Sequence, residues 1–125
     1  MRLPPFPMSA AALLLAPLVL LAAGLPAQAQ AQAAAQTPAP ARQQRLVRMV
    51  RQDCGSCHGM RLGGGLGPAL TPAALQALPP ESIAATIFHG RPGTPMPGWQ
   101  PMLTESEAAW IATQLKQGFP EEPAR

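Results

Sequence analysis

The chain is poor in residue types on which several large protein classes depend. Only 12% of its 125 residues are charged, and it has two cysteines. So few Lys and Arg residues exclude the dense basic stripe that nucleic-acid binding requires, and no nucleic-acid partner is expected. Cys54 and Cys57 belong to one short motif, which leaves no cysteine for a structural disulfide elsewhere. No stretch alternates polar and apolar residues for long enough to form a strand, so we predict an all-α fold.

The first 29 residues have the pattern of an export signal. Arg2 gives a weakly positive start, and the uncharged, leucine-rich run 10–25 spans 16 residues. A bilayer span needs about 20 apolar residues, so this run is short for a membrane anchor, which is the alternative. Small residues follow at 27–29, where a signal peptidase would cleave. We predict a signal peptide over 1–29, cleavage before Gln30 and no stable membrane insertion afterwards.

The rest of the chain is expected to form one tethered domain. Residues 30–41 are Ala, Gln, Pro and a single Thr, and this lack of large apolar side chains predicts a flexible tether. Residues 42–125 form the domain. Without the signal, the chain has eight Lys or Arg and six Asp or Glu, so its formal charge of +2 is mild.

Apolar periodicity and helix end signals predict about four short helices with long loops between them. Thr104 and Glu107 have the spacing of a capping box, and Gly90 stands where a left-handed helix cap would fall. Four glycines within 61–67, followed by Pro68, indicate a loop. The expected helices cover 42–53, 73–78 after an N-cap at Thr71, 80–89, and the stretch between Thr104 and Gly118.

The segment Cys54-Gly55-Ser56-Cys57-His58 has the spacing Cys-x-x-Cys-His, which is typical of covalent attachment of a c-type haem. We expect both thiols to add to the haem vinyl groups and His58 to coordinate the iron. A zinc site and a thioredoxin-type pair also use Cys-x-x-Cys. Zinc needs four ligands, and only His89 could join the motif, whereas a thioredoxin pair belongs to a strand-containing fold. One covalent haem c is therefore the expected cofactor, and in so small a domain it should hold the fold together.

A thioether is the expected second iron ligand, and Met96 is the best candidate. Prolines on both sides of it stiffen the loop that presents its sulfur. Met102 is a rival, although it lies just before the last helix. His89 is another alternative, because it is the only imidazole outside the motif and ends the helix that leads to the methionine loop. Ligation by His58 and Met96 predicts a closed site with a raised reduction potential, since thioether sulfur stabilises ferrous iron.

Two further positions are expected to contact the haem or its ligand. A backbone carbonyl in the Gly67-Pro68 region would accept a hydrogen bond from His58 and fix the tautomer of its ring. The Trp99 indole could reach a haem propionate. Arg61 and Arg91 could neutralise propionates or form a docking patch, although solvated surface arginines are more common.

These residues together resemble the class I cytochromes c. More narrowly, GGLGPAL at 64–70, FHGRPG at 88–93 and the end of the chain over 105–119 are similar to the small monohaem cytochromes c-55X. Such proteins accompany the cytochrome cd type of nitrite reductase in denitrifying bacteria. The resemblance covers about residues 46–119. It implies a class I cytochrome c fold, a periplasmic location, covalent haem, and either electron exchange with the nitrite reductase or a role in maturing its d-type haem.

The leading functional prediction is a soluble, monomeric carrier of single electrons. The sequence offers no evident general base or nucleophile at the site, so no enzyme is expected. An accessory factor for assembly of the d-type haem is the alternative, and it should bind the immature reductase or a tetrapyrrole intermediate. A gas sensor or small haem enzyme is a third possibility, which requires an open sixth position and therefore rapid binding of carbon monoxide.

Overall fold

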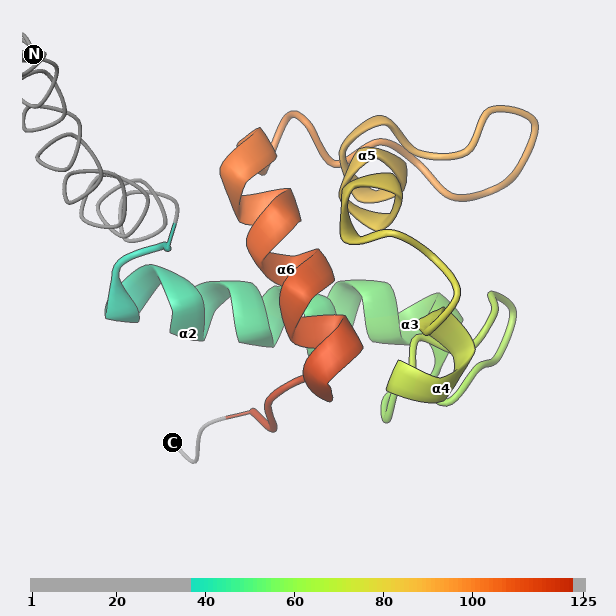
Figure 1. Ribbon diagram of the computed structural model, residues 1–125, viewed down its shortest axis with the longest axis horizontal. Coiled ribbons are helices and arrows are strands. Elements are labelled where there is room, and N and C mark those ends of the chain that lie inside the picture. The colour runs from blue at the N-terminus through green and yellow to red at the C-terminus, as the bar shows by residue number, and fades with distance from the viewer. Residues whose placement is uncertain (1–36, 123–125) are drawn as a thin grey trace, which may run out of the picture. The chain divides into compact units, whose positions relative to one another are not determined.

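The computed structural model describes residues 37–122 of the chain. The predicted signal peptide over 1–29 and most of the predicted tether lie outside these residues. Between 37 and 122 the regular structure is entirely helical, with no strand, which confirms the all-α prediction (Figure 1). None of the helices in this range is long and apolar enough to cross a membrane.

A nearly continuous helical run opens the domain. It consists of α2 (Pro40–Met49), the π-helical turn η1 (Val50–Cys54) and α3 (Gly55–His58). The run begins two residues earlier than predicted, because a proline at the first helical position already has the backbone angle that the helix needs. It extends five residues beyond the predicted end at Asp53 and stops at Gly59, whose φ of 83° leaves helical geometry. The whole Cys-x-x-Cys-His motif therefore lies on the helical run.

The next helix, α4 (Pro72–Leu75), is a single turn with the predicted N-cap. The Thr71 hydroxyl accepts a hydrogen bond from a backbone amide of α4 at 3.3 Å. The helix is shorter than the predicted stretch 73–78. Its end is capped instead by Lys116, whose Nζ donates at 2.6–3.2 Å to three carbonyls, those of Leu75, Gln76 and Leu78.

The last two helices begin and end close to their predicted signals. α5 (Pro80–His89) has the predicted bounds, and α6 (Glu105–Gln117) has the predicted capping box. The Glu107 amide donates to Thr104 Oγ1 at 3.2 Å, while the Thr104 amide donates to Glu107 Oε2 at 2.9 Å. Gly90 follows α5 with a φ of 75° but a ψ of −169°. The predicted left-handed cap at Gly90 is therefore wrong: φ is positive, but the chain leaves the helix in an extended direction.

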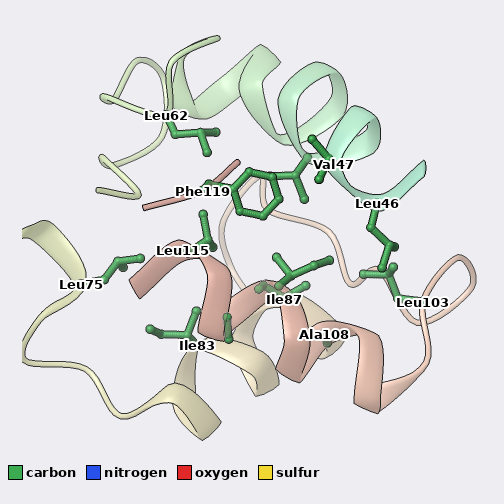
Figure 2. Packing of buried hydrophobic residues seen from close by; sticks show 13 residues of the cluster. Leu46, Val47, Leu62, Leu75, Ile83, Ile87, Leu103, Ala108, Leu115 and Phe119 are labelled. Atoms are coloured by element: carbon green, nitrogen blue, oxygen red, sulfur yellow. The ribbon is translucent and has the colours of Figure 1, made fainter. Parts of the chain in front are cut away.

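A single apolar core joins these helices. α6 packs against α5 and α4, and the buried side chains of all the longer helices form one cluster. Figure 2 shows Ile87 of α5 and Leu115 of α6 in this cluster, with Leu46 of α2 beside Leu103 from the loop before α6. Phe119, just after α6, covers the cluster near Val47. The methionine loop therefore lies between two segments, α5 and Leu103, that belong to the core.

Two arginines tie the first helical run to α6, which crosses it in Figure 1, and to the segment after α6. At one end, Arg42 donates to both carboxylate oxygens of Glu107, at 2.6 and 3.0 Å. In η1, the buried guanidinium of Arg51 donates to the carbonyls of Phe119 at 2.6 Å and Pro120 at 2.9 Å, and lies 5.6 Å from the centre of the Phe119 ring. The first helical run is thus joined to the start of α6 and to the segment that follows α6, by contacts between residues more than 60 positions apart in the chain.

Candidate functional site

The two thiols of the motif differ in their surroundings. Cys54 ends η1 and Cys57 lies one turn later in α3. Because helical residues three apart share a face, both thiols are available to one group bound along the run. Cys54 is half-buried, and burial together with the nearby Asp53 carboxylate raises the pKa of its thiol to about 11. Cys57 is exposed. The two cysteines form no disulfide with each other.

His58, the last residue of α3, is held in one orientation. Its ring is buried, and Nδ1 lies 2.7 Å from the carbonyl oxygen of Pro68. A carbonyl can only accept, so Nδ1 carries a proton, and in the neutral ring Nε2 is the nitrogen with the lone pair. The structure therefore has the hydrogen bond expected from the sequence in the Gly67-Pro68 region. A neutral imidazole with a free Nε2 is the form that binds a metal ion.

The loop after α3 folds back onto the motif through backbone contacts. The Gly67 amide donates to the carbonyl of Cys57, and the Gly64 amide donates to that of His58, both at 2.8 Å. Gly67 also lies against the imidazole, because a Cβ on this residue would be 2.8 Å from two ring atoms of His58. Leu62 in this loop is buried and has a φ of 59°, a positive angle that is unusual for leucine. The loop therefore holds the His58 ring through Gly67 and Pro68.

Met96 lies in the loop between α5 and α6 and is half-buried. Its carbonyl accepts a hydrogen bond from the Arg91 amide at 3.2 Å. The Thr94 hydroxyl donates to the Arg91 carbonyl at 2.8 Å and accepts from the Met96 amide at 3.3 Å. In Figure 1 this loop and the loop after α3 project toward the same end of the molecule.

The two alternative ligands are placed differently. Met102 is 57% exposed, and its carbonyl accepts a hydrogen bond from Arg42 at 3.0 Å. His89 is exposed at the end of α5, where its ring meets that of Phe88 edge-on at 5.0 Å between centroids. Neither residue has the half-buried position of Met96.

The remaining predicted contacts lie at the edge of the core. Trp99 is half-buried and packs against the apolar cluster, and its backbone amide donates to the carbonyl of Ile87 at 3.2 Å. Arg61 and Arg91 are exposed. Trp110 of α6 also packs against the core.

Two features near the site do not follow from the sequence analysis. Arg51 is a buried cation three residues before Cys54, and nothing in the local pattern separates it from Arg45 and Arg48, which are less buried. Gly90 and Gly98 contact each other through their backbones. The sequence does carry a signal for this pair, since two glycines bracket the methionine segment.

The residues present fit a covalently bound haem. Two thiols one helical turn apart, an adjacent imidazole with a free Nε2 and a half-buried thioether match the donor set that c-type haem uses. Among residues 37–122, no group of three or more His, Cys, Asp or Glu side chains is placed to hold a metal ion by itself. The all-helical fold and this donor set define a small class I c-type cytochrome.

Comparisons with known proteins agree with this class. Residues 41–113 match the family described as cytochrome c oxidase, cbb3-type, subunit III. The chain is 53% identical over 83 residues to cytochrome c55X of Stutzerimonas stutzeri, which covers 66% of this chain and 74% of that protein. It is 55% identical over 78 residues to cytochrome c55X of Paracoccus denitrificans, covering 62% and 76%. The solved structure of the c-type cytochrome NirC matches with a TM-score of 0.64 and 53% identity over 65% of this chain and 95% of that one.

The chain belongs to the cytochrome c55X family, and it carries covalently bound haem c.

Proposed function

We propose that this protein is a periplasmic carrier of single electrons and that its acceptor is the cytochrome cd type of nitrite reductase. Haem is attached through Cys54 and Cys57, and its iron is bound by His58 and Met96. The bound haem supplies an iron that changes its charge by one electron. The polypeptide acts by fixing the ligands in both oxidation states.

The observation that carries this proposal is the hydrogen bond from His58 Nδ1 to the Pro68 carbonyl. It leaves only Nε2 for the metal and makes that nitrogen a better donor. The ring is buried and is packed against Gly67, so it has little freedom to rotate when the iron charge changes. A ligand that does not move suits electron transfer, because each change of oxidation state then needs little rearrangement.

The methionine side of the site supports the same function. A half-buried thioether from Met96 would close the sixth position and favour the ferrous state, which raises the reduction potential. Trp99 follows the loop and packs at the edge of the core, from where its indole N–H would reach a haem propionate. Nothing in this arrangement requires a general acid, a general base or a nucleophile, so we propose a carrier and not an enzyme.

The loop after His58 also offers a contact surface for a partner. Leu66 is 93% exposed, and Met60 is largely exposed as well. Both lie within eight residues of His58, so a partner that covers them would lie next to the motif. A small, partly apolar patch is typical of the transient interfaces through which redox proteins meet. We propose that the protein acts as a monomer and docks through this loop.

The test is a stopped-flow measurement of electron transfer. Ferrous protein is mixed with oxidised cytochrome cd nitrite reductase and, separately, with an unrelated haem protein of similar potential. We expect faster oxidation by the nitrite reductase. Leu66→Ser should slow this reaction by about tenfold, whereas Leu78→Ser, a partly exposed leucine after α4, should leave it within about twofold. Oxidation no faster than by the unrelated acceptor would contradict the proposed partner.

The same proteins can be used to distinguish the carrier role from the assembly role. A maturation factor should bind the immature reductase, or a tetrapyrrole intermediate, more tightly than it binds the finished enzyme. Isothermal titration with both forms of the reductase measures this preference. A clear preference for the immature form, together with slow electron transfer to the finished enzyme, would contradict the carrier role and support the assembly role.

The periplasmic location rests on the predicted signal peptide, which lies outside the described residues. Fractionation of cells that produce the full chain tests it. We expect the haem-containing protein in the periplasmic fraction, with an N-terminus near Gln30.

A further inference from the structure

The loop that carries Met96 is closed at its base by two chain segments that run side by side. The Arg91 amide donates to the Met96 carbonyl at 3.2 Å. On the other side of the crossing, the Trp99 amide donates to the carbonyl of Ile87 and the Gln100 amide to that of Phe88, both at 3.2 Å. The end of α5 and the segment after the loop are thus held together by backbone hydrogen bonds.

Glycine is required where these segments cross. A Cβ on Gly90 would lie 2.5 Å from the Gly98 nitrogen and 2.8 Å from the Met96 carbonyl oxygen. A Cβ on Gly98 would lie 2.9 Å from the carbonyl oxygen of His89 and 3.0 Å from that of Phe88. All these neighbours are backbone atoms, which cannot rotate away as a side chain can. Any side chain at either glycine must therefore push the two segments apart.

The tip of the loop is built differently. Gly93 has a φ of 78°, but a Cβ on it would meet nothing within 4 Å. The tip is instead ordered by the Thr94 hydroxyl, which bridges the Arg91 carbonyl and the Met96 amide. Close packing is thus confined to the base of the loop, and the backbone of Met96 takes part in it through its carbonyl.

We propose that Gly90 and Gly98 are positioning residues for the Met96 thioether, because their close crossing keeps the loop shut and so keeps the sixth iron position occupied. The inference rests on the proposed ligation by Met96. Separation of the two segments shifts the Met96 backbone while the loop that holds His58 stays unchanged. The crossing therefore determines how often the site opens to an external ligand.

The glycines of this loop provide a matched pair of variants. Gly98→Ala adds the close contact at a residue whose φ is not positive, whereas Gly93→Ala adds backbone strain at a positive φ without any contact. Both are made as periplasmically matured holoprotein. The readouts are the weak near-infrared charge-transfer band of ferric iron bound to methionine sulfur and the rate at which the ferrous protein binds carbon monoxide. We expect Gly98→Ala to lose most of the band and to bind carbon monoxide at least about tenfold faster, with Gly93→Ala within about twofold of wild type.

The outcomes separate this inference from the proposed function. If the wild-type protein has the band and Gly98→Ala keeps it, the crossing does not position Met96, while ligation by Met96 stands. Equal loss of the band in Gly93→Ala would also overturn the inference. Backbone strain without a close contact would then be enough to remove the Met96 sulfur from the iron. A wild-type protein without the band would contradict ligation by Met96 itself, and the inference would fall with it.

A measurement on the wild-type protein covers the case in which Gly98→Ala does not fold. The amide hydrogens of Trp99 and Gln100 donate across the crossing, so they should exchange slowly with solvent, and that of the exposed Gly93 should exchange quickly. Fast exchange at Trp99 and Gln100 would show that the base of the loop is open and would overturn the inference.

Discussion

The loop after His58 and the loop around Met96 each support one proposed iron ligand, but they do so through different contacts. The first holds the ligand side chain itself, since Nδ1 of His58 is hydrogen-bonded to Pro68 and the ring lies on Gly67. The second holds only the backbone near the ligand, through the crossing of Gly90 and Gly98. A thioether offers no strong hydrogen bond, so its position depends on the loop. The methionine side should therefore open with less loss of overall stability than the histidine side.

Removal of both thiols should have the largest effect, because the proposed ligation by His58 and Met96 makes the haem connect the two loops. In Cys54→Ala/Cys57→Ala no thioether can form, and the domain has only a small core. We expect a loss of stability comparable with that of a whole small domain, on the order of 5 kcal/mol, measured by thermal unfolding followed by far-ultraviolet circular dichroism. Ser56→Ala, which keeps both thiols, is the control. Unfolding of the double variant within a few degrees of wild type would show that the polypeptide is stable without covalent haem.

Gly67→Ala tests the histidine side of the comparison. The new Cβ would overlap the His58 ring at 2.8 Å and displace it from the Pro68 carbonyl. Overpacking of this kind costs about 1–3 kcal/mol, measured by urea unfolding of the holoprotein. Gly63→Ala is the control, because a Cβ there meets nothing within 4 Å. If both variants unfold at the same urea concentration as wild type, the ring is not held by this contact.

Arg42→Met tests a more distant support of the methionine side. Arg42 joins the Met102 carbonyl, after the loop, to the Glu107 carboxylate at the start of α6. The hydrogen bond from Arg42 is the main reason why the pKa of Glu107 falls from its ordinary 4.5 to about 2. A lowered folded-state pKa contributes stability above pH 4.5 that is lost as the pH falls toward 2.

We therefore expect Arg42→Met to lose about 1 kcal/mol at pH 7, since the pair is bidentate and only partly exposed, and less at pH 3. Urea unfolding at the two pH values measures the difference. Arg45→Met, at an exposed arginine outside this pair, should change neither value. An equal loss for Arg42→Met at both pH values would mean that its effect is not electrostatic.

Local chemistry explains why much of the fold could be predicted. The bounds of α5 follow from Pro80 and Gly90, and the start of α6 follows from the Thr104 and Glu107 capping box. These signals act within a few residues, so they can be found without knowledge of the fold. The extension of the first helical run through His58, and its π-helical turn, have no such local signal.

Contacts between distant segments could not be predicted. Arg42 and Arg51 look alike in the sequence, yet one pairs with Glu107 and the other is buried against the carbonyls that follow α6. The crossing of Gly90 and Gly98 depends on how the chain returns to α5 after the loop. At the site, the motif spacing indicated which residues matter, and chemistry indicated that His58 needs a carbonyl partner. The structure was needed to see that the two sides are supported in different ways.

The most direct test of the central claim, that His58 and Met96 close the iron site, is the near-infrared spectrum of the ferric holoprotein. We predict the charge-transfer band of methionine-ligated iron in the wild-type protein, its loss in Met96→Ala and its retention in Met102→Ala. A wild-type protein without this band, or a Met96→Ala variant that keeps it, would contradict the account and would direct attention to His89 or to an open site.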